Sequence, residues 1–238
     1  MIENLPGYVS ITFILTTFLT VGFLFHAVKQ NAFETIGAKI LIFLLAFWLF
    51  FTAFLAISGF YLNTEAFPPR VMSVGVLPAL LVIVAYFIFF RKNFIEKLPL
   101  KTLTLLSVIR IPVEIVLLWL FQGGLVPQSM TFEGRNFDIL SGITAPIVYF
   151  LAFRGGRVNR PLLIVWNLFA LALLANIVTT AILAFPSIDP QLPAALQNRG
   201  VAYFPFIWLP AIVVPIVFFT HLVSLWKLFK QSENEANF

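Results

Sequence analysis

The sequence predicts an all-α, polytopic membrane protein: a bundle of seven transmembrane helices with its N-terminus outside and its C-terminus in the cytoplasm. Hydrophobic residues make up 61% of the chain and charged residues only 11%, with a mean hydropathy of +0.99. A soluble globular domain is about half apolar and about a quarter charged. The second observation behind the prediction is a series of long apolar runs, and the third is an uneven distribution of Lys and Arg.

The apolar runs divide the chain into seven expected spans, because about 20 apolar residues in a helix match a hydrocarbon core about 30 Å thick. Their limits are roughly 8–28, 39–61, 71–90, 101–121, 137–153, 161–184 and 204–226. The fifth run, at about 17 residues, stands at the lower limit for a span. The connections are too short for a soluble domain, so residues 1–238 are expected to form a single membrane domain.

Lys and Arg gather in alternate connections. If the runs are spans, eleven of the fifteen Lys and Arg residues lie on one side: Lys29, Lys39, Arg91, Lys92, Lys97, Lys101, Arg154, Arg157, Arg160, Lys227 and Lys230. Arg70, Arg135 and Arg199 lie on the other side, and Arg110 lies within a run. Positive residues near the ends of spans stay in the cytoplasm. The pattern therefore predicts the orientation above, in a multi-pass protein of a bacterial inner membrane.

Several classes of function are excluded by what the sequence lacks. There is no Cys, which removes disulfides, thiolate metal sites and cysteine nucleophiles. The basic charge follows from the cytoplasmic connections, and no interleaved aromatic and basic loop indicates nucleic-acid binding. The seventh run has no Lys before Lys227 for a retinal Schiff base, and the receptor, hydrolase, metalloprotease and Walker motifs are missing.

Arg110 and Glu114 are the strongest functional candidates. They lie four residues apart in the fourth run, on one helix face, and an ionised side chain within the hydrocarbon costs from roughly 2.5 kcal/mol upward. Pro112, between them, cannot donate to the Val108 carbonyl and predicts a kink. The pair either neutralises itself and locks helices together, or lines a ligand or proton site with Arg110 as anion anchor and Glu114 as its titratable partner.

Other polar residues are expected at a similar depth. Asn176 in the sixth run, and Asp138, Ser141 and Thr144 in the fifth, would line a pocket in the outer half of the bundle, beneath the charged connection that carries Glu133 and Arg135. Ordinary interhelical hydrogen bonds explain Asn, Ser and Thr equally. In this alternative interpretation, Glu133 is a solvated acid in a loop, and Asp138 is an N-terminal helix residue that the helix dipole favours.

His26 and His221 are the chain's two histidines, and both are expected in the inner half of the membrane. A haem or a metal held between them, or a proton relay, is an alternative to simple packing. Two lone histidines without carboxylates at metal-ligand spacing favour packing, so no cofactor and no metal site is predicted.

The segment Met130–Pro146 reads Met-Thr-Phe-Glu-Gly-Arg-Asn-Phe-Asp-Ile-Leu-Ser-Gly-Ile-Thr-Ala-Pro. It resembles a stretch of an uncharacterised family of bacterial seven-span membrane proteins with no assigned function, and the resemblance extends to Ile109–Trp119. It implies the fold and no activity.

Three classes of function remain. The first is the binding or transport of a small anionic or zwitterionic molecule at Arg110 and Glu114, which suits a polar midplane site and proline-broken helices. The second is a membrane sensor or assembly factor that acts through a protein partner. The third is an integral-membrane enzyme, for which Glu114, Asp138 and the histidines are the available acid–base groups. The expected partners are the lipid bilayer and a small-molecule ligand, with no nucleic acid.

Overall fold

The computed structural model describes residues 5–63, 66–156 and 158–236. Throughout these residues the regular structure is helical, with no strand in the part described. Arg157, one of the basic residues in the expected cytoplasmic connections, lies outside the described residues. The expectation of an all-α protein is confirmed.

Six helical segments are long and apolar enough to cross a membrane. They are α1 (Gly7–Asn31), α2 (Ile36–Ile57), η2 with α3 (Val71–Val76, Leu77–Phe89), α4 with η4 and α5 (Leu100–Leu106, Ser107–Ile109, Arg110–Gln122), α7 (Arg160–Leu183) and η9 with α8 (Leu209–Val213, Val214–Ala236). Their starts follow ordinary capping chemistry. Thr35 accepts from the Ala38 N–H at 3.1 Å, and Asn159 accepts from the Leu162 N–H at 3.2 Å, which satisfies donors that the first helical turn leaves free.

The fifth expected span forms a shorter helix, α6 (Ile139–Ala152), of 14 residues. At about 1.5 Å per residue it is about 21 Å long, against a hydrocarbon core of about 30 Å. The structure therefore supports six spans by length. The expected run at 137–153 begins later as a helix because residues 131–138 form turns, and these turns carry Asn136 and Asp138 into the protein.

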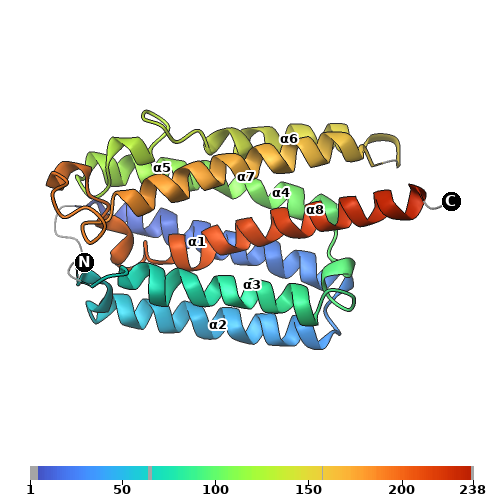
Figure 1. The fold of residues 1–238 in the computed structure, drawn as a ribbon, viewed down its shortest axis with the longest axis horizontal. Coiled ribbons are helices and arrows are strands. Elements are labelled where there is room, and N and C mark those ends of the chain that lie inside the picture. The colour runs from blue at the N-terminus through green and yellow to red at the C-terminus, as the bar shows by residue number, and fades with distance from the viewer. Residues whose placement is uncertain (1–4, 64–65, 157, 237–238) are drawn as a thin grey trace.

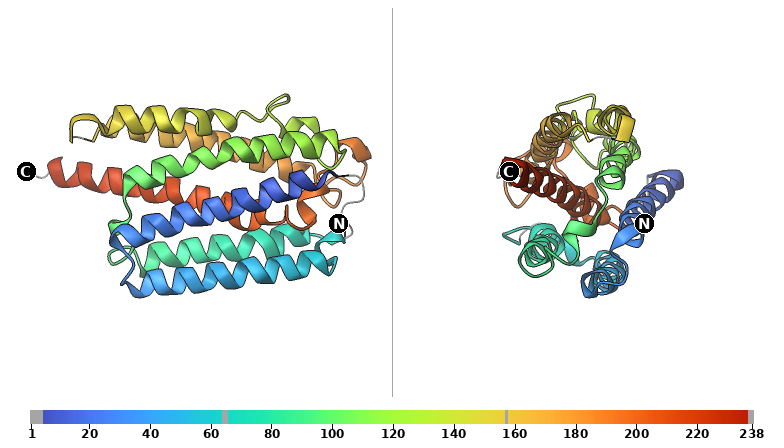
Figure 2. Two further views of the ribbon diagram at one scale, coloured as in Figure 1. Left: turned by 180° about the vertical axis from the view of Figure 1, so that it is seen from behind. Right: turned by 90° about the vertical axis from the view of Figure 1, so that its right-hand side faces the viewer.

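The helices run side by side along the long axis of the molecule (Figure 1). α8 is the central helix, and it contacts α1, α3, α4 and α7. In the most apolar 18-residue stretch of its segment, 67% is buried inside the protein, whereas in that of α2 only 11% is buried. Figure 2 shows α2 and α3 at one side of the bundle and α5, α6 and α7 at the other, with α1 and α8 between them.

Two of the long segments begin with π-helical turns, η2 and η9, which pack against each other. Pro215 follows η9 and has no N–H to offer the Ala211 carbonyl four residues earlier. The indole Nε1 of Trp48 on α2 donates to that carbonyl instead, at 3.2 Å. A wide helical turn and an indole donor from a neighbouring helix thus replace the hydrogen bond that proline removes.

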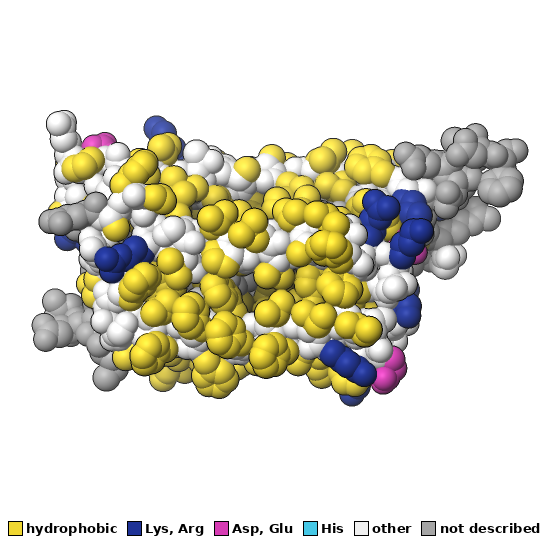
Figure 3. Space-filling view, turned by 60° about the horizontal axis from the view of Figure 1, so that its bottom comes forward, with side chains coloured by type: hydrophobic (Ala, Val, Ile, Leu, Met, Phe, Trp, Pro, Cys, Tyr) yellow, Lys and Arg dark blue, Asp and Glu magenta, His cyan; other side chains and the backbone are white. Residues whose placement is uncertain are grey.

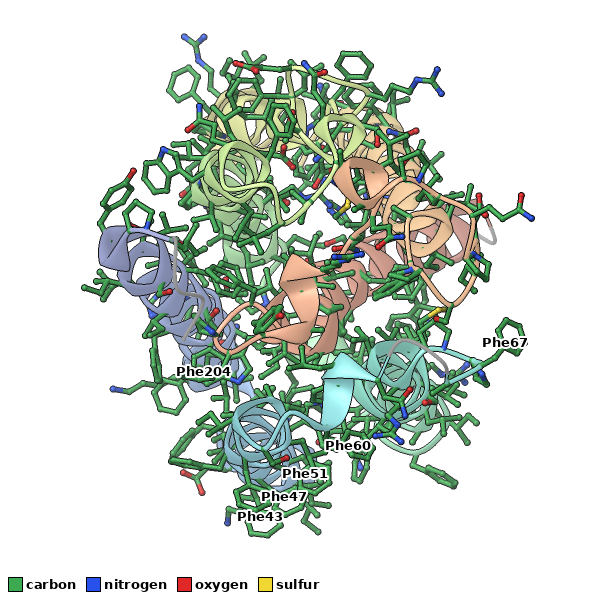
Figure 4. The ribbon with its side chains drawn as sticks, turned by 90° about the vertical axis from the view of Figure 1, so that its left-hand side faces the viewer. Phe43, Phe47, Phe51, Phe60, Phe67 and Phe204 are labelled. Carbon is green, nitrogen blue, oxygen red and sulfur yellow. The ribbon has the colours of Figure 1, made fainter. Side chains whose placement is uncertain are left out.

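The outer surface is apolar in the way a bilayer requires. Phe43, Phe47 and Phe51 lie on the outer side of α2 (Figure 4), and Phe43 is 70% exposed. The face over α2 and α3 is covered mostly by hydrophobic side chains (Figure 3). Such a surface is stable against lipid and unfavourable against water. The chain is a multi-pass integral membrane protein in contact with the lipid bilayer.

Trp48→Phe removes the indole donor from the Ala211 carbonyl. We expect it to lower the free energy of unfolding in detergent by about 1 kcal/mol, the usual scale of an interhelical hydrogen bond in membranes. The matched control is Trp208→Phe. Trp208 Nε1 donates to the Leu49 carbonyl at 3.1 Å. Because Leu49 lies inside α2, its carbonyl still accepts the backbone hydrogen bond of the helix when the indole is removed, so the control should lose less free energy of unfolding. Equal losses in the two variants would contradict the role of Trp48.

Candidate functional site

Arg110 lies at the start of α5 and is 2% exposed. Its Nη1 donates to Asp138 Oδ1 at 2.6 Å and to the Ala170 carbonyl at 3.2 Å. Its Nη2 lies 3.1 Å from His221 Nε2. One guanidinium therefore joins α5 to the start of α6, the middle of α7 and the central helix α8.

The backbone departs from the α-helix directly before this arginine. The turn η4 (Ser107–Ile109) is 3-10 helical and separates α4 from α5. Pro112 cannot donate to the Val108 carbonyl, which lies inside that turn. The predicted kink thus takes the form of a tightened turn, and it sets the direction in which Arg110 leaves the helix.

The ion-pair partner differs from the expected one. Arg110 pairs with Asp138, which lies 28 residues away in sequence, and not with Glu114 one turn along the same helix. Glu114 Oε1 instead accepts from Asn136 Nδ2 at 2.5 Å. Helical spacing places two side chains on one face, but a fixed loop that brings a second carboxylate to the guanidinium decides the pairing.

Asn136 holds the two carboxylates apart and in place. Its Nδ2 also donates to the Met130 carbonyl at 3.0 Å, and its Oδ1 accepts from the Asp138 N–H at 3.0 Å. Asn136 is fully buried. A single amide in the turn before α6 therefore positions Asp138 for Arg110 and binds Glu114 at the same time.

His221 is a neutral acceptor in this network. A guanidinium N–H can only donate, so the His221 Nε2 that meets Arg110 must accept. The proton then lies on Nδ1, which donates to Asn167 Oδ1 at 2.7 Å. Asn167 is oriented in turn, because its Nδ2 donates to the Leu163 carbonyl at 2.7 Å. We call Arg110, Glu114, Asn136, Asp138, Asn167 and His221 the polar cluster.

A cavity of about 110 Å³ adjoins the polar cluster on the side of Glu114 and Asp138. Its other walls are mainly apolar and come from η2, α5, α7 and η9; they include Met72, Val113, Leu174 and Pro210. Glu114 is 1% exposed, and its Oε2 has no hydrogen-bond partner among the described residues. A residue that lines the cavity thus has one buried carboxylate oxygen without a hydrogen-bond partner among the described residues.

The charges of the polar cluster do not balance. With both acids ionised, Glu114 and Asp138 carry two negative charges, Arg110 carries one positive charge, and His221 is neutral by its hydrogen bonds. A buried charge without a partner is costly. The charges of the polar cluster would balance with a proton on Glu114 or a positively charged group beside it.

The structure brings together three of the residues predicted for the site: Arg110, Glu114 and Asp138. Ser141 is buried one turn into α6, and its hydroxyl has no partner among the described residues. Thr144 Oγ1 accepts from Trp166 Nε1 at 3.0 Å, which is the interhelical hydrogen bond considered as its alternative role.

The remaining predicted residues lie outside the cluster. Glu133 and Arg135 are exposed, and Asn176 Nδ2 donates to the Arg135 carbonyl at 2.8 Å. The two histidines have different partners, because exposed His26 lies 2.8 Å from Gln30 Nε2, whereas His221 lies in the cluster. Among the described residues no group of three His, Cys, Asp or Glu side chains could hold a metal, and the cofactor alternative remains a prediction.

Sequence reasoning missed Asn136 and Asn167, and for His221 it favoured packing and did not connect it with Arg110. Asn167 and His221 each lie within an apolar run, and a polar residue in a span faces other polar groups more often than lipid. That signal could have found them, but only a tertiary structure shows that they meet Arg110.

These features define a multi-pass helical membrane protein with a buried ion pair at the junction of four helices. The chain belongs to the family of the domain of unknown function DUF8737, whose model matches residues 67–229. The polar cluster and the segment Met130–Pro146 lie within the matched region, so the predicted membership of an uncharacterised family is confirmed. Comparison with curated proteins and with solved structures finds no match.

A double-mutant cycle tests the ion pair. Asp138→Leu leaves a buried guanidinium without its carboxylate, and we expect a loss of about 3–5 kcal/mol in the free energy of unfolding. Arg110→Met combined with Asp138→Leu should regain much of that loss, because neither charge remains. If Glu114→Leu couples to Arg110→Met more strongly than Asp138→Leu does, the originally expected pairing is correct.

Proposed function

We propose that the protein binds a small molecule carrying an ammonium group, with this group placed at Glu114 Oε2 in the cavity beside the polar cluster. The observation that carries the proposal is that Glu114, a buried residue with one unpartnered carboxylate oxygen, lines a cavity. Asp138, a second carboxylate, also lines the cavity. In a site of low dielectric these charges attract a cation strongly.

Of the two ligand types expected from the sequence, the zwitterion is the better supported. A ligand with only negative charge would meet both carboxylates, whereas Arg110 already binds Asp138, Ala170 and His221. Arg110 is not among the residues that line the cavity. The role of Arg110 as an anion anchor stays a prediction. Its Nε lacks a hydrogen-bond partner among the described residues, so it is the donor with which Arg110 could bind an anion.

We further propose that binding serves transport across the membrane. The cavity is lined by residues of η2 and η9, the π-helical turns at the start of their segments, and α5 beside it begins after the 3-10 turn η4. Helices broken at a midplane site are the usual construction of secondary transporters. A sensor or assembly factor would bind the same ligand without moving it, so a flux measurement separates the two functions.

A thermal-shift experiment with compounds of matched size tests the ligand class. Butylamine and 4-aminobutyrate should stabilise the purified protein, and butyrate should not, because only the first two carry an ammonium group. At a ligand concentration of about 100 times the Kd, binding should raise the free energy of unfolding by about 2.7 kcal/mol. Glu114→Gln should abolish the shift, while Glu133→Gln, which removes an exposed carboxylate, should keep it. Stabilisation by butyrate, or an amine shift that survives Glu114→Gln, would contradict the proposal.

The topology we propose has seven spans, with α6 as the fifth, an outside N-terminus and a bacterial inner membrane as its location. The support is the distribution of charge: Lys29, Lys39, Arg91 and Arg154 all flank helix ends that lie at the end of the bundle where α8 finishes (Figure 1). The ion pair between Asp138 and Arg110 holds the start of α6 inside the protein. The non-helical residues before α6 are therefore buried in protein and not exposed to lipid, so a helix shorter than the hydrocarbon core can still form part of a span.

Reporter fusions test this topology. Fusions after Gly156 and after Lys230 should report the cytoplasm, and fusions near Arg135 and Asn198 should report the outside, as the positive-inside rule requires. Reporters at Arg135 and Gly156 on the same side would mean that α6 does not cross. External reporters at both Gly156 and Lys230 would reverse the orientation.

A further inference from the structure

A second cavity, separate from the polar cluster, lies between α1, α2, α3 and α8. It has a volume of about 200 Å³, and the residues that line it include Leu24, Trp48, Ala79, Ile83, Ile216 and Phe219. Phe47 also lines it and is 51% exposed. The cavity therefore reaches the lipid-facing surface of α2, on the face that Figure 3 shows covered by hydrophobic side chains.

The walls offer nothing to hold water. The two polar groups of the lining side chains are already engaged: Trp48 Nε1 donates to the Ala211 carbonyl at 3.2 Å, and the Tyr86 hydroxyl donates to the Gly37 carbonyl at 2.7 Å. An apolar cavity without hydrogen-bond partners stays dry. In a bilayer, hydrocarbon chains are the molecules available to fill it, and filling restores the dispersion contacts that a void loses.

The cavity is maintained by the backbone around it. Pro78 and Pro215 line it, and each is the second residue after a π-helical turn, η2 and η9 respectively. These turns and prolines keep α3 and α8 from the regular close packing of two straight helices. Ala79 and Ala211 add short side chains at the same level, so the space is not filled from within the protein.

Basic residues stand at one end of this cavity. Lys39 comes two residues before Leu41, which lines the cavity, and so lies about 3 Å nearer the start of α2. Arg91 comes five residues after Tyr86, two residues past the end of α3. The hydrogen bond from Tyr86 to Gly37 ties these two helix ends together. Both basic side chains are exposed, and the guanidinium of Arg91 lies 5.8 Å from the centre of the Trp226 ring. Lys227 and Lys230 nearby bind Glu96.

We propose that this cavity is a binding site for an anionic phospholipid, with an acyl chain between α2, α3 and α8 and the phosphate group at Lys39 and Arg91. The charge of the two side chains complements the headgroup, and the dry apolar walls complement the chain. Each Lys or Arg near the membrane surface strengthens the binding of anionic lipid. The site is independent of the polar cluster and of the function proposed for it.

Native mass spectrometry of the delipidated, full-length protein tests the site with two probes, dioleoylphosphatidylglycerol and dioleoylphosphatidylcholine. The wild-type protein should bind the anionic lipid more tightly by about thirtyfold, as two surface cations at about 1 kcal/mol each predict. Lys39→Gln with Arg91→Gln should bring this preference to about twofold or less. The control, Lys101→Gln with Arg154→Gln, removes the same charge from the far side of the bundle and should keep the preference.

The chain-binding part is tested by filling the cavity. Ala79→Phe, and the smaller Ala79→Leu as a second variant that disturbs packing less, should weaken the binding of both lipids. Ala46→Phe, on an exposed position of α2 that does not line the cavity, should bind as the wild type does. Equal affinity for the two lipids in the wild-type protein, or unchanged binding in the folded Ala79 variants, would overturn the proposal.

Discussion

A guanidinium buried among apolar helices is the constraint on which the rest of this structure depends. Arg110 cannot stay charged inside the bundle without a carboxylate and further acceptors. Asp138, the Ala170 carbonyl and His221 meet that demand from three different segments. Because each contact comes from another helix or helix start, the relative positions of α5, α6, α7 and α8 follow from satisfying one side chain.

The same demand explains the irregular backbone. Arg110 and Glu114 both lie in α5 and share one stripe of it, while the turn η4 precedes the arginine and the loop before α6 enters the protein. Asn136 in that loop bonds Glu114 and also positions Asp138. The second carboxylate is thereby kept from the arginine's hydrogen bonds and left facing a cavity. Structural satisfaction of one charge leaves the other beside the cavity, where we propose that a ligand binds.

The membrane class, most of the helix limits and the burial of Arg110 and Glu114 inside the bundle could be predicted from the sequence, because they depend on local hydropathy and on the cost of burying charge. The partner of Arg110 could not, since Asp138 reaches it through a folded loop. Thr144 and Asn176 share the depth of the site but bond to Trp166 and to the loop. Depth along a span is readable from sequence, whereas rotation of a helix about its axis depends on packing.

The length of α6 is a second feature that could not be predicted from the sequence. Its run is apolar enough to suggest a span, but the turns that bring Asn136 and Asp138 inward take residues from its start. The need to neutralise Arg110 therefore shortens the helix that supplies the carboxylate.

The most direct test of this account is the protonation state of His221, measured by nitrogen-15 NMR of histidine-labelled protein at neutral pH. A neutral ring with its proton on Nδ1 and an accepting Nε2 is required if Arg110 donates to it and Asn167 accepts from it. Exposed His26 provides an internal reference in the same spectrum. We predict that His221 shows this tautomer and that its Nε2 signal shifts in Arg110→Met. A proton on Nε2, or a signal unchanged by Arg110→Met, would contradict the central position of Arg110.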